Sequence, residues 1–278
     1  MPLYTTTAGT RGIQPDNFGP LVVQPTIDLA VAAKVSRVVT TAANHFRIPV
    51  VTADASAAWV AEGDEIIPSD PTLSEITVTP AKVAGLTIVS RELADDSNPA
   101  AASVVGESLA RDIARKVDAA YFGALAAPAP SGLGALSGVQ TYVNAGAFSS
   151  LDFAAIAISK AEIVGATIDA FVAGPDVALS LATIKQASGS NQPVLGTDAR
   201  QATDRMILGV PLHVSASVAA NTLWAIDSSR CWLVLRDNAT VEADRSVFFT
   251  SDRVAVKATM RAGFAFPHPA SVVKVSTA

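Results

Sequence analysis

The residues that could carry out chemistry are few, and they lie far apart in the sequence. The three histidines are His45, His213 and His268, and the single cysteine is Cys231. Zinc sites draw on several Cys and His ligands at short spacing, and none of these residues stands in such a motif. The spacing therefore favours isolated buried or surface histidines, and it predicts no metal site and no catalytic thiol.

Two other segments resemble functional motifs only superficially. The glycine-rich run 132–138 has Ser137 where a dinucleotide-binding loop needs its third glycine, and it follows a predicted helix instead of a strand. Asp95 and Asp96 stand in a predicted turn before a helix, where carboxylates interact favourably with the helix dipole. We predict no catalytic residue and no cofactor, so the protein is not expected to be an enzyme.

The composition indicates a folded chain with little charge to cover its surface. Of 278 residues, 50% are hydrophobic and only 16% are charged, where about 25% is usual. The net charge of −5 comes without a readable basic patch, which argues against strong nucleic-acid binding. Because the cores of protein interfaces are depleted in charge, the composition favours an assembly of copies.

The elements that follow the first 27 residues alternate between extended and helical patterns. The first 27 residues contain four prolines, which leaves two alternatives, a frayed terminus or an arm that becomes ordered on a neighbour. Apolar spacing predicts a short helix over 27–39, followed by an extended stretch over 45–52 that breaks at Pro49.

Residues 51–75 contain six acidic residues and no Lys or Arg. Strand-like pieces at 58–60, 76–79 and 86–89 flank turn residues at Pro68 and Pro71, so we predict a long projecting β-hairpin. A solvated acidic loop would explain the charges, but not the apolar residues among them, which are Trp59, Ile66, Ile67 and Leu73.

A long helix is predicted over about 98–125, because apolar residues recur every four positions from Val105 to Leu125. Helices over about 151–164 and from Pro175 to near Gln186 flank a buried strand at 170–173, which is typical of a small α/β domain. The pattern after Gly209 is almost entirely β, with a turn predicted between Arg236 and Thr240.

The order of these elements resembles that of the major capsid proteins of tailed bacteriophages, the fold named after phage Hong Kong 97. The resemblance covers roughly residues 25–275 and is carried by an ordered series of segments, namely 48–50, 57–70, 76–78, 88–93, 95–97, the long helix with Asp118, 123–134, 209–212 and 261–264.

This resemblance implies an α+β fold of the Hong Kong 97 type, with five parts. They are an N-terminal arm (1–27), an extended β-hairpin loop (52–88), a peripheral domain (28–51 and 89–134) with a long spine helix (about 98–125), an α/β axial domain (135–230), and return strands of both domains (231–278). It further implies a structural shell protein that forms pentamers and hexamers of itself. Implied partners are a separate scaffolding protein, a portal, possibly a decoration protein, and packaged double-stranded DNA held by weak contacts. The implied location is the virion, after assembly in the host cytoplasm.

The residues expected to touch neighbouring subunits are acidic or aromatic in the hairpin and basic in the first 50 residues. They are Trp59, Glu62, Asp64, Glu65 and Asp70, facing Arg11, Lys34, Arg37 and Arg47. Some members of the family join subunits through a Lys–Asn isopeptide bond. Lys82 is the only lysine between residues 51 and 90, so we predict no such bond; the alternative set is Lys82 with Asn238 and Glu242.

Two other functions remain open from the sequence. An encapsulin-like bacterial compartment resembles the same fold but encloses cargo enzymes. An α/β enzyme is the third alternative, although no catalytic constellation supports it.

Overall fold

The computed structural model describes residues 30–63, 65–90, 101–187, 190–195, 205–244 and 246–277. The helices in these ranges are α2 (Val31–Lys34), α4 (Ala101–Phe122), α5 (Asp152–Ile163) and α6 (Pro175–Thr183), and the short 3-10 turns are η2 (Leu133–Ala135), η3 (Ser228–Arg230), η4 (Phe249–Ser251) and η5 (Pro269–Ser271). The strands are β1 (Arg37–Thr41), β2 (Phe46–Ala53), β3 (Thr72–Val78), β4 (Ala81–Ser90), β5 (Gln140–Asn144), β6 (Ala170–Ala173), β7 (Met206–Ile207), β8 (Val210–Val214), β9 (Thr222–Ile226), β10 (Trp232–Asp244), β11 (Arg253–Ala265) and β12 (Val273–Thr277). They form a mixed α+β fold.

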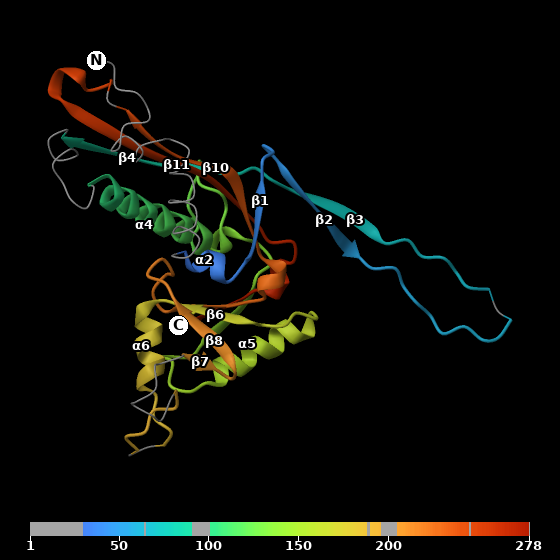
Figure 1. The fold of residues 1–278 in the computed structure, drawn as a ribbon. Helices are drawn as coiled ribbons and strands as arrows, with labels where there is room; N and C mark the ends of the chain where they lie inside the picture. Colours follow the sequence, from blue (N-terminus) through green and yellow to red (C-terminus); the bar gives the residue numbers. More distant parts are fainter. Residues whose placement is uncertain are drawn as a thin grey trace.

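A four-stranded sheet of order β1-β10-β11-β4 packs on the long helix α4 (Figure 1). The four-residue spacing of the predicted helix is confirmed, since Leu109, Ile113 and Val117 are all buried beneath the sheet. The side of α4 opposite these buried residues is exposed to solvent and carries the charged residues at 111, 112, 115 and 116. The helix ends at Phe122, and the predicted start near residue 98 lies outside the described residues.

The turn predicted between Arg236 and Thr240 is wrong. Strand β10 runs without interruption from Trp232 to Asp244, and only its pairing register with β11 shifts between Arg236 and Thr240. The thirteen-residue partner strand β11 continues past this point, so a bulge preserves more backbone hydrogen bonds than a turn would.

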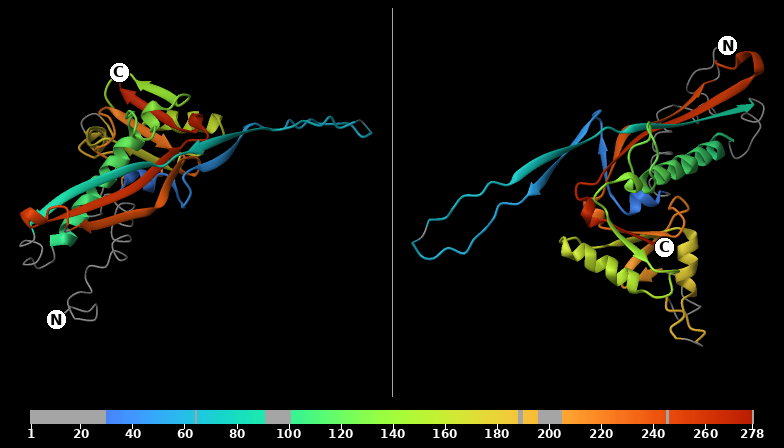
Figure 2. Two further views of the ribbon diagram at one scale, coloured as in Figure 1. Left: turned by 90° about the horizontal axis from the view of Figure 1, so that it is seen from above. Right: turned by 180° about the vertical axis from the view of Figure 1, so that it is seen from behind.

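The β2–β3 hairpin projects from the four-stranded sheet, and both views in Figure 2 show it extending away from the body. Its ladder runs from Phe46 opposite Val78 to Ala53 opposite Thr72. Pro49 does not break β2 as predicted, because β2 pairs only with β3 and its other edge needs no N–H donor. Residues 58–60 form no strand, and the piece predicted at 86–89 belongs to β4 in the four-stranded sheet, not to the hairpin.

The second half of the chain forms a six-stranded sheet of order β5-β12-β9-β6-β8-β7. The predicted strand 170–173 is confirmed, and β6 and β9 are buried on both faces. One face, which includes Phe171 and Ala225, packs with residues of α5 and α6. The other face, which includes Val172 and Trp224, packs into the core that also contains α4, so one core joins both halves of the described molecule.

The helix before the hairpin is shorter than predicted. Only Val31–Lys34 is helical within the described part of 27–39, and Val38 and Val39 lie in β1. These β-branched residues instead extend the sheet, where β1 pairs in parallel with β10. Helix α6 likewise ends at Thr183, three residues before the predicted Gln186.

The glycine-rich run 132–138 packs against the end of α4. A Cβ on Gly132 would lie 1.9 Å from the carbonyl oxygen of Ala120, so only glycine fits there. The run therefore serves close packing at the C-terminal end of a helix, where free carbonyl groups disfavour a phosphate.

Candidate functional site

The tip of the hairpin, residues 54–71, presents apolar and acidic side chains to solvent. Trp59 is fully exposed at 105% of its reference area, and Ile66 and Ile67 are exposed by 77% and 84%. Glu62, Glu65 and Asp70 are exposed beside them, while Asp64 lies outside the described residues. Large apolar side chains grouped in this way on an exposed segment are typical of a contact surface.

Little within the chain holds the tip. The side chain of Ser69 accepts a hydrogen bond from the amide of Ser56 at 2.8 Å and donates one to its carbonyl oxygen at 3.0 Å. In the described parts of the chain the ion pairs are Arg47–Glu75, Arg230–Asp227 and Lys257–Glu242, so none includes an acidic residue of the tip. The tip therefore keeps its negative charge and its apolar surface available to another molecule.

The base of the hairpin, in contrast, is packed firmly on the four-stranded sheet. Ile48, Val50 and Val78 form a small buried cluster with Val234 and Ala265 of the sheet. The approach is close, because a Cβ on Gly263 would lie 2.6 Å from a methyl group of Val78. The hairpin is thus fixed at its base on the sheet face opposite α4, and it is free at its tip.

Of the four basic residues predicted to face the hairpin, the three that the structure describes have separate surroundings. Arg11 lies outside the described residues. Arg47 forms a 3.4 Å ion pair with Glu75 across its own hairpin, and the Arg37 guanidinium lies 4.7 Å from the ring centre of Trp232. Lys34 ends α2 and lies near Asp118 and His213. Their contacts with neighbouring subunits stay a prediction.

Asp118 on α4 joins three elements of the body. Its carboxylate accepts hydrogen bonds from the amides of Val31 and Ala32 at 3.1 and 2.9 Å, which caps α2, and from the hydroxyl of Ser215 at 3.4 Å. Burial raises the pKa of this carboxyl, and the three hydrogen bonds oppose the rise. Sequence spacing alone gave no signal for this role.

Of the side chains considered for chemistry, Cys231 is buried, and Asp95 and Asp96 lie outside the described residues. Burial raises the pKa of the Cys231 thiol to about 12, which leaves it protonated and unreactive at neutral pH. Among the described residues, no group of three or more His, Cys, Asp or Glu side chains is arranged to hold a metal ion. The described helices also include none that is both long and apolar enough to cross a membrane.

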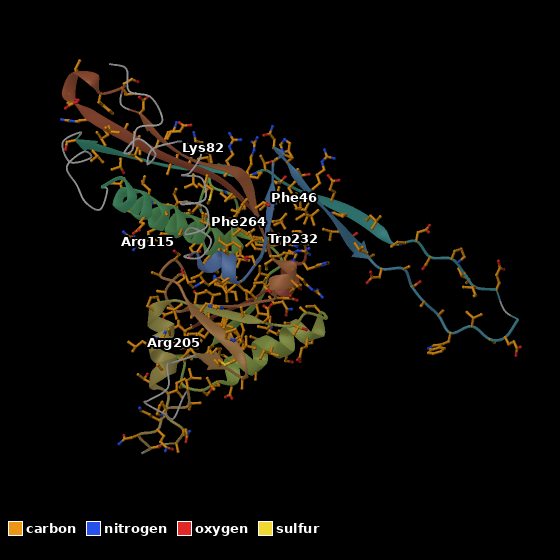
Figure 3. All side chains as sticks on the ribbon, viewed as in Figure 1. Phe46, Lys82, Arg115, Arg205, Trp232 and Phe264 are labelled. Carbon is orange, nitrogen blue, oxygen red and sulfur yellow. The ribbon has the colours of Figure 1, made fainter. Side chains whose placement is uncertain are left out.

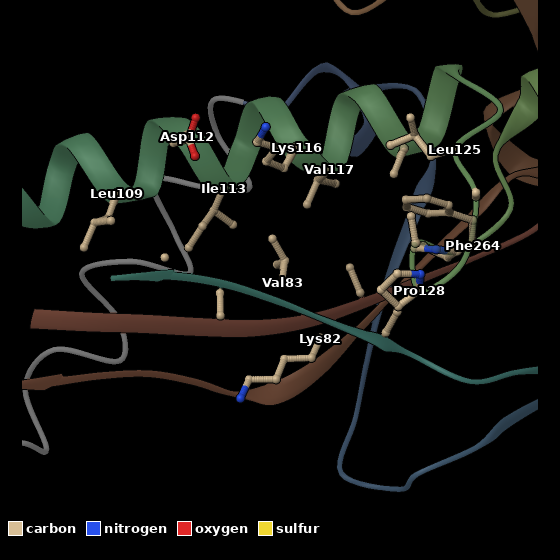
Figure 4. A pocket seen from close by; sticks show the side chains of 18 residues that line it. Lys82, Val83, Leu109, Asp112, Ile113, Lys116, Val117, Leu125, Pro128 and Phe264 are labelled. Atoms are coloured by element: carbon tan, nitrogen blue, oxygen red, sulfur yellow. The ribbon is translucent and has the colours of Figure 1, made fainter. Parts of the chain in front are cut away.

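An apolar groove of about 470 Å³ lies between α4 and β4 (Figure 4). Leu109, Ile113, Val117 and Phe264 line it, and Val83 points into it from β4. The neighbouring Lys82 points the opposite way, toward the outer face of the sheet (Figure 4). The charged residues among those that line the groove are Lys82, Asp112 and Lys116, and the rest of its lining is apolar.

A basic surface that the sequence analysis missed lies on this outer face. The register places Lys82 on β4 opposite Arg261 on β11, which in turn pairs with Arg236 on β10. The signal was present in β11, where exposed Arg253, Lys257 and Arg261 recur every fourth residue and so share a face. The same register separates Lys82 from Glu242, whose carboxylate pairs with Lys257 at 2.6 Å.

Comparison with known proteins gives a consistent result. The model of the Phage capsid family matches residues 17–277. No curated protein matches the sequence. A solved structure from Microbacterium phage Oxtober96 is similar with a TM-score of 0.76 and 18% identity, covering 90% of this chain and 91% of that one. One from Mycobacterium phage Adephagia has a TM-score of 0.72 and 18% identity, covering 90% of each chain.

A third structure covers nearly the whole chain. It is described as the capsid of a native GTA particle computed with C5 symmetry, and it has a TM-score of 0.69 and 17% identity over 99% of each chain. At these low identities, the structural likeness shows a shared fold. The class of protein is shown by the family match. The encapsulin-like alternative is not favoured, and the family and the fold indicate a structural protein. The chain therefore belongs to the phage capsid family, as a major capsid shell protein.

Proposed function

We propose that copies of this chain assemble through their hairpins into pentamers and hexamers, which close into an icosahedral shell around the phage genome. The observation that carries this proposal is the hairpin tip, where Trp59, Ile66 and Ile67 are exposed on a segment fixed only at its base. A monomer gains nothing from exposing these side chains. Contact with a neighbouring copy removes them from water, which is favourable by about 25 cal/mol per Å² of apolar surface.

We propose the following division into Hong Kong 97-type parts, which the arrangement of sheets and helices supports. The four-stranded sheet with α4 corresponds to the peripheral domain and its spine helix, and the six-stranded sheet with α5 and α6 corresponds to the axial domain. Strands β2 and β3 with the tip correspond to the extended loop, which makes the loop 46–78 in place of 52–88. Residues 1–27 lie outside the described residues, and we propose them as the arm on the family resemblance alone.

The other partners are proposed on chemical grounds and by the family resemblance. With a net charge of −5, the shell contacts packaged DNA only weakly and without sequence preference. A scaffolding protein, a portal and a decoration protein complete the particle, which assembles in the host cytoplasm. The chain itself has no catalytic role in this scheme.

We also propose that mature shells are held together without isopeptide bonds. Lys82 is the only lysine between residues 51 and 90, and it lies within the paired strand β4, where it cannot swing with the hairpin tip. Denatured mature particles should run as one band near the monomer mass of 28.5 kDa. A ladder of multimers that survives boiling and reductant, and that disappears in Lys82→Ala, would contradict this.

The decisive experiment is electron microscopy of the full chain expressed with its scaffolding protein, beside a variant in which residues 55–70 are replaced by a short Gly-Ser turn. The parent should form uniform closed particles. The variant should keep its melting temperature, because the tip adds nothing to the core, and should stop at free subunits or capsomers. Normal particles from the variant would show that the hairpin is not the assembling element.

A further inference from the structure

The two strands of the hairpin connect to opposite edges of the four-stranded sheet. Strand β2 follows β1, which forms one edge, and β3 is followed after two residues by β4, which forms the other. The base of the hairpin therefore crosses the face of β10 and β11, where it packs on Val234 and Ala265. Because two separate attachments fix a direction and one attachment does not, this arrangement can hold the hairpin at a defined angle to the body.

On the β1 side, the ring of Trp232 on β10 supports the start of β2. Its centre lies 6.1 Å from the ring centre of Phe46, and Figure 3 shows the two residues side by side at the base of the hairpin. The Arg37 guanidinium lies 4.7 Å from the same ring centre. Asn44, in the connection between β1 and β2, accepts a hydrogen bond of 2.6 Å from Nη1 of Arg236. Side chains as well as backbone therefore hold this end of the hairpin.

On the β4 side, the connection between β3 and β4 is seated closely on β11. Pro80 in this connection is buried, and a Cβ on Gly263 would lie 3.3 Å from its Cα and 2.6 Å from a methyl group of Val78. The ring of proline also fixes its own φ angle. This end of the hairpin therefore cannot rotate unless Pro80 and Val78 separate from β11.

A hydrogen bond joins the two ends. Nδ1 of His45 lies 2.9 Å from Oγ1 of Thr79. His45 directly precedes β2 and Thr79 directly follows β3, so the bond lies just below the last backbone pair of the hairpin, Phe46 opposite Val78. The spacing of the histidines gave His45 no role in metal binding or catalysis, and this contact gives it one at the base of the hairpin.

The angle at the base decides where the tip lies. The extended segment 46–63 spans at most about 60 Å at about 3.3–3.6 Å per residue, so a rotation of about 10° at the base moves the tip by up to about 10 Å. Apolar side chains are in contact only when their heavy atoms approach within about 4.5 Å. A small rotation at the base is therefore enough to remove Trp59 from a contact with a second copy.

We propose that the contacts of Trp232, Gly263 and the His45–Thr79 pair, here called the base contacts, set the angle between hairpin and body and thereby the curvature of the shell. This inference rests on the proposed function and names the residues that position the assembling segment. Copies that hold their hairpins within a narrow range of angles meet at a narrow range of positions, which gives particles of uniform diameter. The residues of the base contacts act through the hairpin, so they are positioning residues.

The angle can be measured in the free full-length subunit by pulsed electron paramagnetic resonance between two spin labels. Glu62→Cys on the tip and Arg115→Cys on α4 carry the labels, since both positions are exposed, whereas Cys231 is buried with a pKa of about 12. The parent should give one narrow distribution of distances. Thr79→Val with Trp232→Ala removes the hydrogen bond and the supporting ring, and should widen the distribution about twofold or more.

A matched control lies in the same hairpin. Thr52 also donates a hydrogen bond between the two strands, to the carbonyl oxygen of Thr72 at 3.1 Å, but farther from the base. Thr52→Val should therefore leave the distribution as it is in the parent. The melting temperature reports folding, and if Trp232→Ala unfolds the subunit, Thr79→Val alone provides a milder variant at an exposed residue.

Electron microscopy of particles formed with the scaffolding protein gives the second readout. The parent and Thr52→Val should form particles of one diameter. Variants that lack the base contacts should give a spread of diameters about twofold wider or more, or sheets that do not close, because their subunits no longer meet at one angle.

The possible outcomes are distinct. A parent distribution as broad as that of the base-contact variants would overturn the inference, because the hairpin would then have no fixed angle. Wider distances in these variants together with particles of unchanged diameter would also overturn it, since the angle would not set the curvature. Failure of the parent to form particles would contradict the proposed function instead, whereas the distances in the free subunit report the base contacts by themselves.

Discussion

Trp59 and Trp224 have the same side chain and opposite surroundings. Trp224 lies on β9 and is only 2% exposed, packed into the core between the two sheets, whereas Trp59 on the hairpin tip is fully exposed. The core around Trp224 is completed within one chain, and the surface around Trp59 needs a second molecule. The protein thus uses some apolar residues for folding and others for assembly. Those used for folding lie in the body, and those available for assembly lie on the hairpin.

The largest expected effect on stability is at Trp224. Replacing it with alanine removes a buried aromatic side chain and leaves a cavity between β9 and the α4 core, at a cost of about 3–5 kcal/mol in the free energy of unfolding. Denaturant titration of the purified subunit measures this. A cost below about 1 kcal/mol would mean that the two halves of the described molecule do not share a cohesive core.

Replacing Asp118 tests whether the hydrogen bonds from α2 to this side chain of α4 stabilise the body. Asp118→Ala leaves the amides of Val31 and Ala32 without acceptors and should lower the free energy of unfolding by about 2–3 kcal/mol. Ser217→Ala, a small change in the loop after β8 near Ser215, is the control and should have little effect. An unchanged unfolding midpoint for Asp118→Ala would show that α2 needs no cap from α4.

The same carboxyl has a predictable pH dependence. Because burial raises its folded pKa above the unfolded value of 3.8, protonation of the carboxyl favours the folded state. This protonation-linked part of the stability is complete below pH 3.8 and is lost as the pH rises through the folded pKa. The stability of Asp118→Asn relative to the parent should therefore improve as the pH rises from below 3.8 through the folded pKa of Asp118. Parallel stability curves for the two proteins over this range would contradict the assignment.

Replacing Gly263 tests the close packing between the four-stranded sheet and the base of the hairpin. A methyl group at this position collides with Val78 and lies 3.3 Å from the Cα of Pro80, so Gly263→Ala should cost about 1–3 kcal/mol through overpacking. It should also disturb the direction of the hairpin. Gly146→Ala is an instructive comparison, since its Cβ would meet no atom but its φ of 96° would be strained. Restoration of stability in Gly263→Ala by Val78→Ala would confirm the contact.

The smallest effect on stability is expected at Trp59. Trp59→Ala should change the free energy of unfolding of the isolated subunit by less than about 0.5 kcal/mol, because the side chain contacts little in its own chain. The yield of assembled particles should nevertheless fall. A large loss of subunit stability would mean that Trp59 packs within the chain, and the contrast with Trp224 would then be wrong.

Local patterns predicted the regular elements well where one face of the element decides burial. The four-residue apolar spacing of α4, the buried strand 170–173 and the hydrophobic, acidic character of the hairpin follow from side-chain chemistry and period alone. Predictions failed where long-range pairing overrode local signals. Pro49 was tolerated because β2 has a free edge, and residues 236–240 continued a strand because β11 ran beside them.

The amino-acid sequence by itself determined that this protein has little charge, an acidic and apolar projecting segment and a long amphipathic helix, because these depend only on residue type and spacing. Only the tertiary structure decided which residues meet. Asp118 caps α2 from 86 residues away, and Lys82, Arg236 and Arg261 form one row although β4 and β10 are separated by more than half of the chain. Such contacts depend on strand order and register, which local periodicity does not encode, since each strand can bury its apolar face against several alternative partners.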